Sequence, residues 1–322
     1  MTQRKLGIVM DPLESIRPEN DTTVHLLDAA QRYDLSITYL PQKSLYIQNG
    51  EVFGSGHLIK TFIQASPWYQ IQNTQHNLPL SNFDVILMRK DPPFTLEYIY
   101  TTYMLELAEK KGVLVLNKPQ SLRDANEKLF ATHFPHCCPP TLISQDQTLL
   151  LDFWKKEQST VFKPLDKMAG QSIFVTHAND PNVRVIIEAL TENGTTPILV
   201  QRYLPEIHTQ GDKRILLVNG KPAPFAVARF PMQGETRANL AAGGKGVVVP
   251  LTEHDYWLCE QIGPTLKAKN LLFVGIDVIG NFITEINVTS PTGLPLIARE
   301  QPSIDIAGEF IQSIITLLEL SK

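Results

Sequence analysis

The spacing of apolar residues over the first 120 positions predicts short strands separated by helices. Residues 6–10 form an apolar run of strand length, and Asp21 precedes a segment in which Val24, Leu27 and Ala30 fall on one helical face. Comparable runs of strand or helix type follow at 35–40, 83–88, 96–111 and 113–116. Because strands that alternate with helices usually pair in parallel, we expect a parallel, doubly wound sheet in this part of the chain.

The middle of the chain has a mixed pattern. We expect a helix that Ser121 opens and that carries Lys128, and a domain boundary near the Cys- and Pro-rich stretch at 133–140. The elements expected after it are helices at 149–156 and 182–192 and strands at 160–164, 172–176 and 197–203. This combination predicts a small α+β unit.

Two hairpins and one long loop mark the last third. The hairpins are predicted by Asn219-Gly220 and Gly280-Asn281, since such dipeptides between apolar runs are typical of tight turns. The runs are 214–218 with 223–228, and 273–279 with 282–286. Thr252 and Asp255 predict a capped helix between them. The Gly-rich segment 231–246 exceeds the ~12 to 15 residues common for structureless loops, so we expect it to be a lid.

Composition restricts the class of protein. A chain of 322 residues suits two or three domains of ~100 to 200 residues each. Acidic residues outnumber basic ones by 33 to 29, and the resulting charge of −4 argues against nucleic-acid binding. The three cysteines cannot all pair, and no apolar run approaches the ~18 residues of a membrane span. We therefore expect a cytoplasmic protein that binds neither nucleic acid nor membrane.

The second hairpin carries a candidate metal site. Its pairing brings Asp277 onto one strand and places Glu285 and Asn287 on one face of the other. Hard oxygen ligands favour Mg²⁺, which takes one or two carboxylates and completes its shell with phosphates and water. The alternative is an edge hairpin whose polar face is merely solvated. We favour the metal site, because these polar residues stand in otherwise apolar strands.

Basic residues near this hairpin indicate an anionic ligand. Lys163 ends a strand before a Gly-containing loop, and Arg214, Arg229 and Arg237 lie on two strands and on the expected lid. Each of them alone is most simply a solvated side chain, as is Lys128. A GxGxxG after the first strand and a GxxxxGK[ST] are both missing, which argues against a dinucleotide dehydrogenase and a P-loop NTPase.

A nucleophilic thiol is not expected. Cys137 and Cys138 have His133 and His136 nearby, but no carboxylate is evident that would orient either histidine. The sequence also lacks the GxSxG of serine hydrolases. Acyl transfer through a covalent enzyme intermediate is therefore not predicted.

Several long stretches closely resemble the prokaryotic glutathione synthetase family of the ATP-grasp superfamily. They are LGIVMDP (6–12), VILMRKDPPF (85–94), NKPQSLRDANEKLF (117–130), GETRANLAAGGKG (234–246), FVGIDVIG (273–280) and TEINVTSPTG (284–293). The resemblance implies an α/β protein with the ATP-grasp fold. It implies a Rossmann-like parallel-sheet substrate domain at 1–122, a small α+β lid domain at 123–199, and a larger α+β domain at 200–322 with a flexible loop at 230–246.

The resemblance also implies an activity. Members of this family ligate γ-L-glutamyl-L-cysteine and glycine to glutathione, through an acyl phosphate and with release of ADP and phosphate. This is the second step of glutathione biosynthesis. ATP is the co-substrate, Mg²⁺ is the expected metal with Mn²⁺ as the alternative, and a homotetramer is the expected assembly.

Site residues follow from the same resemblance. Those implied for ATP are Lys128, Lys163, Gln201, Arg202, Tyr203, Leu204 and Asp212. The metal ligands implied are Asp277, Glu285 and Asn287, and the catalytic arginines are Arg214, Arg229 and Arg237. Substrate-binding residues are Asp11, Arg89, Ser290 and Thr292. The flexible loop is represented by Gly234, Glu235, Thr236, Asn239, Gly243 and Gly244.

One loop departs from the family pattern. Family members usually carry DGxGG where this chain has Asp166-Lys167-Met168-Ala169-Gly170, so two glycines have gained side chains. We expect a changed backbone path there, with Lys167 as an additional charge for the phosphates. Two other functions stay open at this point: another ATP-grasp carboxylate-amine ligase, such as a D-alanine:D-alanine ligase, and a non-catalytic ATP-binding module.

Overall fold

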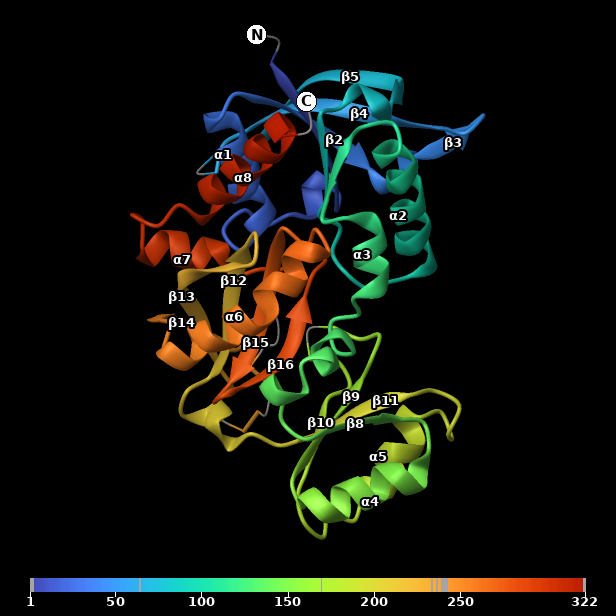
Figure 1. Cartoon of the computed structure of the whole chain (residues 1–322), viewed down its shortest axis with the longest axis vertical. Coiled ribbons are helices and arrows are strands. Elements are labelled where there is room, and N and C mark those ends of the chain that lie inside the picture. The colour runs from blue at the N-terminus through green and yellow to red at the C-terminus, as the bar shows by residue number, and fades with distance from the viewer. Residues whose placement is uncertain are drawn as a thin grey trace.

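Three β-sheets follow one another along the long axis of the molecule. A computed structural model gives the structure of residues 3–63, 65–168, 170–232, 234–235, 237–238 and 243–320. The first sheet lies at one end, close to both chain termini, the third sheet lies in the middle, and the second lies at the other end (Figure 1). No helix in these ranges is long and apolar enough to cross a membrane.

The first sheet contains parallel strands at its centre. Its strands are β1 (Arg4–Met10), β2 (Leu35–Pro41), β3 (Tyr46–Gln48), β4 (Glu51–Thr61), β5 (Tyr69–Pro79), β6 (Val85–Met88) and β7 (Leu114–Leu116). Strands β2, β1, β6 and β7 are neighbours in this order and run parallel, as predicted. Helices α1 (Thr22–Arg32) and α2 (Leu96–Glu109) pack on opposite faces, because alternate residues of β1 belong to different cores.

The same sheet has an antiparallel half that the sequence did not predict. Strand β4 pairs antiparallel with β2, β3 and β5. Nearly all of β5 is exposed, and its sequence YQIQNTQHNLP is dominated by amides rather than by alternating apolar residues. A pattern search depends on one buried face, and β5 has none, so the prediction of a wholly parallel sheet was wrong here.

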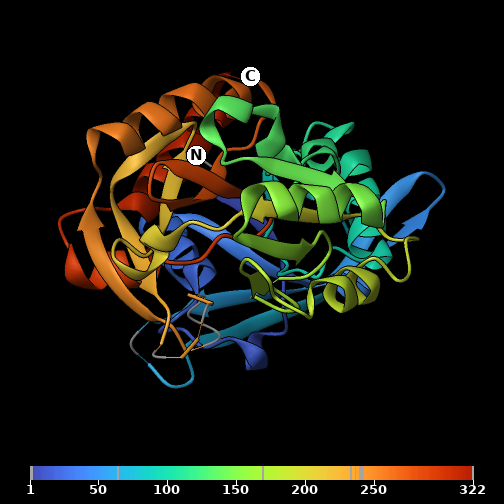
Figure 2. The same ribbon diagram turned by 90° about the horizontal axis from the view of Figure 1, so that it is seen from below.

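The second sheet builds the small unit. It contains β8 (Thr141–Ser144), β9 (Thr160–Pro164), β10 (Phe174–Thr176) and β11 (Ile198–Arg202), in the antiparallel order β10-β9-β11-β8. Helices α4 (Gln147–Glu157) and α5 (Val183–Leu190) cover one face and turn outward, toward the viewer in Figure 2. Phe162 and Val200 point into this core, which leaves Val161, Lys163 and Gln201 on the other face.

The third sheet carries both predicted hairpins. It contains β12 (Asp212–Val218), β13 (Lys221–Phe230), β14 (Lys245–Pro250), β15 (Phe273–Ile279) and β16 (Phe282–Asn287), in the order β14-β13-β12-β15-β16. Asn219 and Gly220 have φ values of 49° and 71°, as the turn requires. Helix α6 (Glu253–Ala268), which begins with the predicted Thr252–Asp255 capping box, covers one face.

Alternation along β12 separates two kinds of surface. Ile215 and Leu217 pack under α6, together with the buried ion pair between Lys213 and Asp255. Asp212 and Arg214 point to the opposite face. That face is packed at one end by α7 (Leu294–Glu300) and α8 (Ile306–Leu320), and it lines two cavities at the other.

Helix α8 returns to the first sheet. It packs against α1, and Phe310 and Ile311 belong to the same core as Leu6 and Ile8 of β1 (Figure 1). The last helix therefore covers the first sheet, although the division at 122/123 and 199/200 assigns it to the third domain. That division stays a prediction.

Candidate active site

Two adjoining cavities lie on the free face of the third sheet. The first cavity, ≈ 840 Å³ including space open to solvent, lies between this sheet and the free face of the second sheet. The second cavity, ≈ 960 Å³ on the same measure, extends from Arg214 and Arg229 to the loop at Ser290 and Thr292. Glu285 and Met168 line both cavities, so a ligand in one would meet a ligand in the other there.

Four buried charges on the third sheet form what we call the sheet cluster: Asp212, Arg214, Arg229 and Asp277. Arg214 donates from Nη2 to Asp277 Oδ2 at 2.9 Å, and Arg229 Nη2 lies 2.9 Å from Asp277 Oδ1 and 2.6 Å from Asp212 Oδ2. Burial alone would raise the pKa of Asp277, but the two arginines hold it well below its usual range. Two of the three predicted arginines, Arg214 and Arg229, therefore contact the predicted metal ligand Asp277 directly.

The negative charge of Asp212 is less well balanced by arginines than that of Asp277. Burial raises the pKa of Asp212 to about 6, and Arg229 opposes this rise only in part. Its Oδ2 accepts from Arg229, whereas its Oδ1 is buried and has no hydrogen-bond partner among the described residues. Asp212 lines the first cavity. A buried acceptor without a donor is costly, so a ligand that donates a hydrogen bond would be stabilised here.

The three candidate metal ligands lie on one face of the third sheet. Asp277 is paired with Glu285 across β15 and β16, and Asn287 Nδ2 lies 3.4 Å from Asp277 Oδ2. The Glu285 carboxylate has one cation near it in the described ranges, Lys163 at 3.9 Å. No group of three or more His, Cys, Asp or Glu side chains that could hold a metal occurs in these ranges. Two carboxylates and an amide fit an ion that completes its shell with phosphate and water.

Two buried lysines approach the first cavity from different units. Lys163 of β9 is 8% exposed, and Lys128 is 4% exposed. Lys128 Nζ donates to the Lys167 carbonyl at 2.8 Å and so holds the atypical loop 166–170 against the cavity. The Lys167 ammonium lies 3.5 Å from Asp166, and Met168 lines both cavities. Ala169 lies outside the described residues.

The prediction that Lys128 sits on a helix opened by Ser121 was wrong. Helix α3 spans Pro119–Asp124 with proline in its first turn, and Lys128 follows in a turn. Ser121 lies inside α3 and donates from Oγ to the Lys269 carbonyl. Proline at the first helical position was the better start signal. The short helix lets the chain turn at 125–129 toward the cavities.

The segment expected to bind adenine runs from the second sheet to the third. Gln201, Arg202, Tyr203 and Leu204 all line the first cavity. Gln201 Nε2 donates to Thr141 Oγ1 at 2.9 Å, and Arg202 Nε donates to Glu157 at 2.7 Å. Their side chains are therefore held by protein partners, which leaves the backbone of the segment as the surface for a flat base. Their role as ATP ligands stays a prediction.

Part of the predicted lid lies beside the first cavity. Arg237 and the buried Ala238 line it, and Arg237 Nη2 lies 2.7 Å from Glu235 Oε2. Gly234, Gly243 and Gly244 are described, whereas Thr236 and Asn239 lie outside the described residues. The predicted range 230–246 overlaps regular structure at both ends, since Phe230 ends β13 and Lys245 begins β14.

The four predicted substrate residues fall into two groups. Ser290 and Thr292 line the second cavity, and Ser290 donates to Asp91. Asp11 and Arg89 are not among the residues that line either cavity. Arg89 is buried and donates to the Pro291 carbonyl at 3.1 Å, so it supports the Ser290–Thr292 loop from behind.

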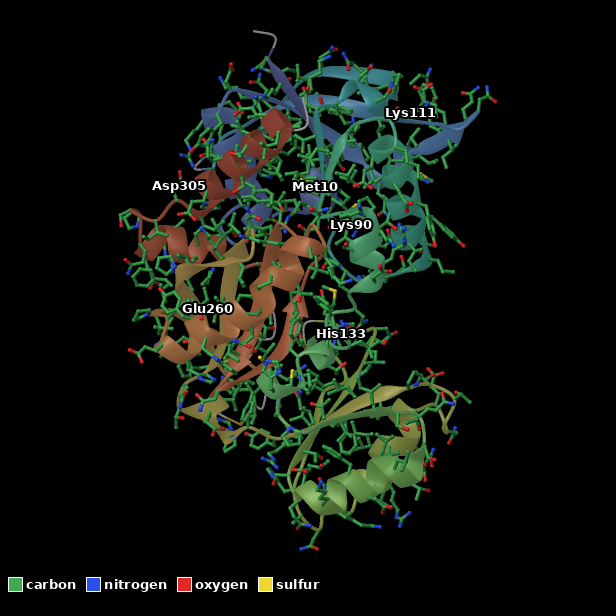
Figure 3. The ribbon with its side chains drawn as sticks, viewed as in Figure 1. Met10, Lys90, Lys111, His133, Glu260 and Asp305 are labelled. Carbon is green, nitrogen blue, oxygen red and sulfur yellow. The ribbon has the colours of Figure 1, made fainter. Side chains whose placement is uncertain are left out.

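Asp11 supports the neighbouring loop in a similar way. Its carboxylate pairs with Lys90 at 2.6 Å and accepts from the Asp91 amide at 2.9 Å. Figure 3 labels Lys90 near the centre of the molecule, where the first unit meets the β15–β16 hairpin. A role of Asp11 or Arg89 as a direct substrate ligand stays a prediction.

The cysteines show no sign of activation. Cys137 and Cys259 are buried, all three cysteines are unpaired, and burial raises the pKa of the Cys138 thiol to about 12. A thiol with this pKa is protonated at neutral pH and is a poor nucleophile. This agrees with the expectation that no thiol takes part in the chemistry.

The sequence did not single out Glu127. This residue precedes Lys128, lines the second cavity, and accepts from Thr289 Oγ1 at 3.1 Å. Burial raises the pKa of Glu127, and the nearby Glu285 raises it further. No local sequence signal could have identified it, because its neighbours in the cavity come from β16 and the loop after it.

Family models match nearly the whole chain. A model described as the N-terminal domain of prokaryotic glutathione synthetase matches residues 5–123, and one described as the ATP-grasp domain of the same family matches residues 127–302. The glutathione synthetase of Pseudomonas syringae pv. tomato is 54% identical over 288 residues, which cover 89% of this chain and 90% of that protein. The glutathione synthetase of Escherichia coli O157:H7 is 49% identical, with 98% and 99% covered.

Solved structures with low sequence identity share the fold. A D-cycloserine synthetase has a TM-score of 0.67 at 12% identity, with 99% of this chain and 100% of that chain covered. D-alanyl-alanine synthetase A from Vibrio cholerae has a TM-score of 0.60 at 14% identity, with 99% of each chain covered. The ATP-grasp ligase PsnB has a TM-score of 0.61 at 11% identity, with 98% of each chain covered. With the ATP-grasp fold and the matches of both domain models, this chain belongs to the prokaryotic glutathione synthetase family.

Proposed function

We propose that the chain ligates γ-L-glutamyl-L-cysteine to glycine, using ATP and releasing ADP and phosphate, and so forms glutathione. Family membership supports this reaction. The observation that carries it is the contact of the two cavities at Glu285 and Met168. ATP in the first cavity and the dipeptide in the second would bring the γ-phosphate and the reacting carboxylate to one boundary.

The first chemical step is phosphoryl transfer. An oxygen of the dipeptide's cysteinyl carboxylate attacks the γ-phosphorus, the bond to ADP breaks, and an acyl phosphate forms. Lys163 and Lys128 approach this point from two sides, and the lysine charges favour the transferring phosphoryl group. Nε and Nη2 of Arg214 donate to Asp277. Its Nη1 is left to donate to a substrate oxygen.

The second step forms the amide. Glycine binds as an ammonium and first gives one proton to solvent. Its neutral amine then attacks the acyl carbon, phosphate leaves, and a second proton goes to solvent or to the leaving phosphate. Water would hydrolyse the acyl phosphate, so the cavity must close before the first step. The segment with Arg237, beside the first cavity, supports such a lid.

The lid role can be tested through Arg237. Arg237→Met removes the pair with Glu235 and the charge at the cavity. We expect ligation to fall roughly 10-fold or more, with ATP affinity nearly unchanged and a larger share of ATP hydrolysed without ligation. Arg299→Met, in an exposed pair with Glu300, is the matched control. Wild-type coupling of hydrolysis to ligation in the Arg237 variant would contradict the assignment.

A divalent metal is part of the proposed reaction. The oxygen donors Asp277, Glu285 and Asn287 would hold it, with Mg²⁺ as the proposed ion and Mn²⁺ as the alternative. Mg²⁺ and ADP are present in a solved complex of the ATP-grasp ligase PsnB. When bound, the ion would neutralise charge on the phosphates of ATP. Titration of the apoprotein with each ion at fixed ATP, followed by phosphate release, distinguishes the two.

One assay tests the proposed function. Phosphate release from ATP is measured with γ-glutamylcysteine alone, glycine alone, both together, and D-alanine in place of both. Release that needs both substrates, with glutathione identified by mass spectrometry, is expected. Release with D-alanine alone would indicate a different carboxylate-amine ligase, and no release under any condition would indicate a non-catalytic ATP-binding module.

A homotetramer is proposed as the assembly. Two exposed surfaces support self-association: the uncharged edge strand β5, and a stripe on α2 formed by Leu96, Tyr100 and Tyr103, which are 51–61% exposed. Two different self-complementary surfaces are what a tetramer with dihedral symmetry needs. Sedimentation velocity should give one tetrameric species, and Tyr100→Glu with Tyr103→Glu should reduce it to dimers.

A cytoplasmic location is also proposed. Three unpaired cysteines suit a reducing compartment, and ATP as co-substrate is supplied there. Cell fractionation with an antibody to the chain tests this location.

A further inference from the structure

Two carboxylates at the second cavity, Asp91 and Glu127, are held by hydroxyl groups, and we call them the loop carboxylates. Neither forms an ion pair with a lysine, arginine or histidine of the described residues. Asp91 accepts from Ser290 Oγ, and Glu127 accepts from Thr289 Oγ1. The two arginines of the sheet cluster line the same cavity, but they pair with the carboxylates of that cluster, Asp212 and Asp277.

Glu127 is fixed beside the reacting end of the cavity. Its carbonyl accepts from the Ile286 amide at 2.9 Å, which ties it to the strand that carries Glu285 and Asn287. The hydrogen bond from Thr289 then orients its carboxylate. Asp91 lies instead on the first unit, next to the Ser290 loop. The two loop carboxylates therefore come from different units and are held by consecutive residues, Thr289 and Ser290, of one loop.

Glu127 also faces a smaller cleft. Together with Asn126, Leu165 and Met168 it lines a space of ≈ 500 Å³, including the part open to solvent. Met168 lines this side cleft and both larger cavities. A small amino acid in the side cleft would therefore reach the reacting carboxylate without passing through the volume that the dipeptide fills.

The chemistry of the substrates supplies the missing cations, and this step rests on the proposed function. The dipeptide brings an ammonium at its glutamyl end, far from the carboxylate that reacts. Glycine brings a second ammonium, which must lie close to that carboxylate. Two substrate ammonium groups thus match two carboxylates. Burial raises the pKa of Glu127, and the charges of Lys128 and Arg214 oppose this rise only in part, so a substrate cation in contact with Glu127 would be stabilised.

We propose that Glu127 binds the ammonium group of the incoming glycine and holds it beside the reacting carboxylate. Thr289 positions the carboxylate for this contact. The residue thereby selects an amino acid as acceptor over a neutral amine. Asp91 is left to the glutamyl end of the dipeptide.

The decisive variant is Glu127→Gln, which keeps size and hydrogen bonding and removes the charge. We expect KM for glycine to rise roughly 10- to 100-fold, because hydrogen bonds between charged groups contribute more than neutral ones. KM for ATP should stay within about 2-fold, and KM for γ-glutamylcysteine should rise much less than KM for glycine, because Glu127 lines the cavity of the dipeptide but by this proposal pairs with the glycine ammonium. Unchanged KM for glycine would overturn the proposal.

A neutral acceptor separates binding from a structural role. Hydroxylamine carries no charge at neutral pH and traps an acyl phosphate as a hydroxamate. Glu127→Gln should form hydroxamate at nearly the wild-type rate while its ligation of glycine falls. An equal loss with both acceptors would mean that the variant damages the site as a whole, and the proposal would fail.

Two further variants keep the test informative. Asp91→Asn is the matched control and should raise KM for the dipeptide but not for glycine. If Glu127→Gln does not fold, Thr289→Val removes only the hydroxyl that orients Glu127, and KM for glycine should then rise a few-fold; no rise would overturn the proposal. Wild-type phosphate release that depends on both substrates is established first, so that a failure of the proposed function is recognised separately.

Discussion

The carboxylates of the sheet cluster and the loop carboxylates line adjoining cavities but differ in how their charge is balanced. In the sheet cluster, Asp277 contacts two arginines, and its pKa is held below its usual range. In the loops, Asp91 and Glu127 have hydroxyl donors, and burial raises the pKa of both. Within the described residues, the sheet carboxylates thus form ion pairs with arginines, whereas the loop carboxylates form none.

This difference separates two tasks. A buried carboxylate with its own arginines is fixed in place and orients donors and metal ligands. A buried carboxylate without a cation is costly until a ligand brings one, so it favours binding of a charged substrate. The same residue type therefore positions the proposed metal site at the first cavity and recognises substrate at the second.

The largest effect is expected from Asp277→Asn, which breaks the balance of the sheet cluster. Arg214 and Arg229 would remain buried without this counter-charge, and we expect a loss of roughly 3 to 5 kcal/mol of unfolding free energy. Urea denaturation measures it. Asp91→Asn is the comparison and should cost much less. Equal losses for the two variants would show that the two groups do not differ as described.

Glu285→Gln tests the carboxylate that lies between the two groups. Among the described residues, Lys163 is the one cation that pairs with Glu285, at 3.9 Å, so the charge of Glu285 is available to a metal. We expect phosphoryl transfer to fall roughly 100-fold or more and the metal concentration for half-maximal rate to rise, with little change in stability. Steady-state kinetics at varied Mg²⁺ measure both. Normal turnover would remove Glu285 from the metal site.

Asp212 gives the sheet cluster a pH dependence of its own. Its pKa of about 6 in the folded protein exceeds the ordinary value of 3.8, so the folded state binds the proton more tightly than the unfolded state. Its contribution to stability is present below that ordinary value and is lost as pH rises through about 6. In Asp212→Asn, the change in unfolding free energy with pH should therefore be smaller by about 1 to 3 kcal/mol than in the wild type. Identical urea midpoints for variant and wild type from pH 4 to 7 would contradict the direction.

Asp305→Asn should have the smallest effect, because its ion pair lies at the surface outside both groups. Asp305 pairs with Arg32 at 2.8 Å and accepts from the Gly308 amide at 2.9 Å, at the start of α8. Asparagine keeps the cap and loses the ion pair, so we expect a loss of about 0.5 kcal/mol.

The pH dependence of that small loss has a defined sign. The hydrogen bond from Arg32 lowers the pKa of Asp305, so the stabilising contribution is present above its ordinary pKa and is lost as pH falls through the folded value. Thermal unfolding of variant and wild type should therefore differ at pH 7 and converge at low pH. A loss of stability in Asp305→Asn as large as that in Asp277→Asn would contradict the expected difference between surface and buried ion pairs.

Local signals in the sequence predicted the hairpins that build the site. Asn219-Gly220 and Gly280-Asn281 are found as turns, and the period of two correctly placed Asp277, Glu285 and Asn287 on one face. Such features depend on residues close together in the chain and on backbone geometry that few residue types adopt. The arrangement of these hairpins within an ATP-grasp fold was predicted from the family resemblance and not from local signals.

Features without a local signal were missed. The amide-rich β5 has no buried face, and Lys128 was placed on a helix that ends four residues before it. The partners of Asp277 were also not predicted, since Arg214 and Arg229 come from different strands whose register was unknown. The spacing of apolar residues predicts whether a segment is a helix or a strand and which face is buried. It does not predict which distant residues its side chains contact.

The sequence by itself determined the strands, the turns, the faces of the third sheet and the family. Tertiary structure decided the charge balance of the site, because that balance depends on distances between side chains from distant segments. It gave Asp277 two arginines, and it placed Glu127, 150 residues away in the chain, beside the neighbouring strand β16 with no ion pair among the described residues. Coulombic and desolvation energies depend on position in space, so identical carboxylates acquired different roles only when the chain folded.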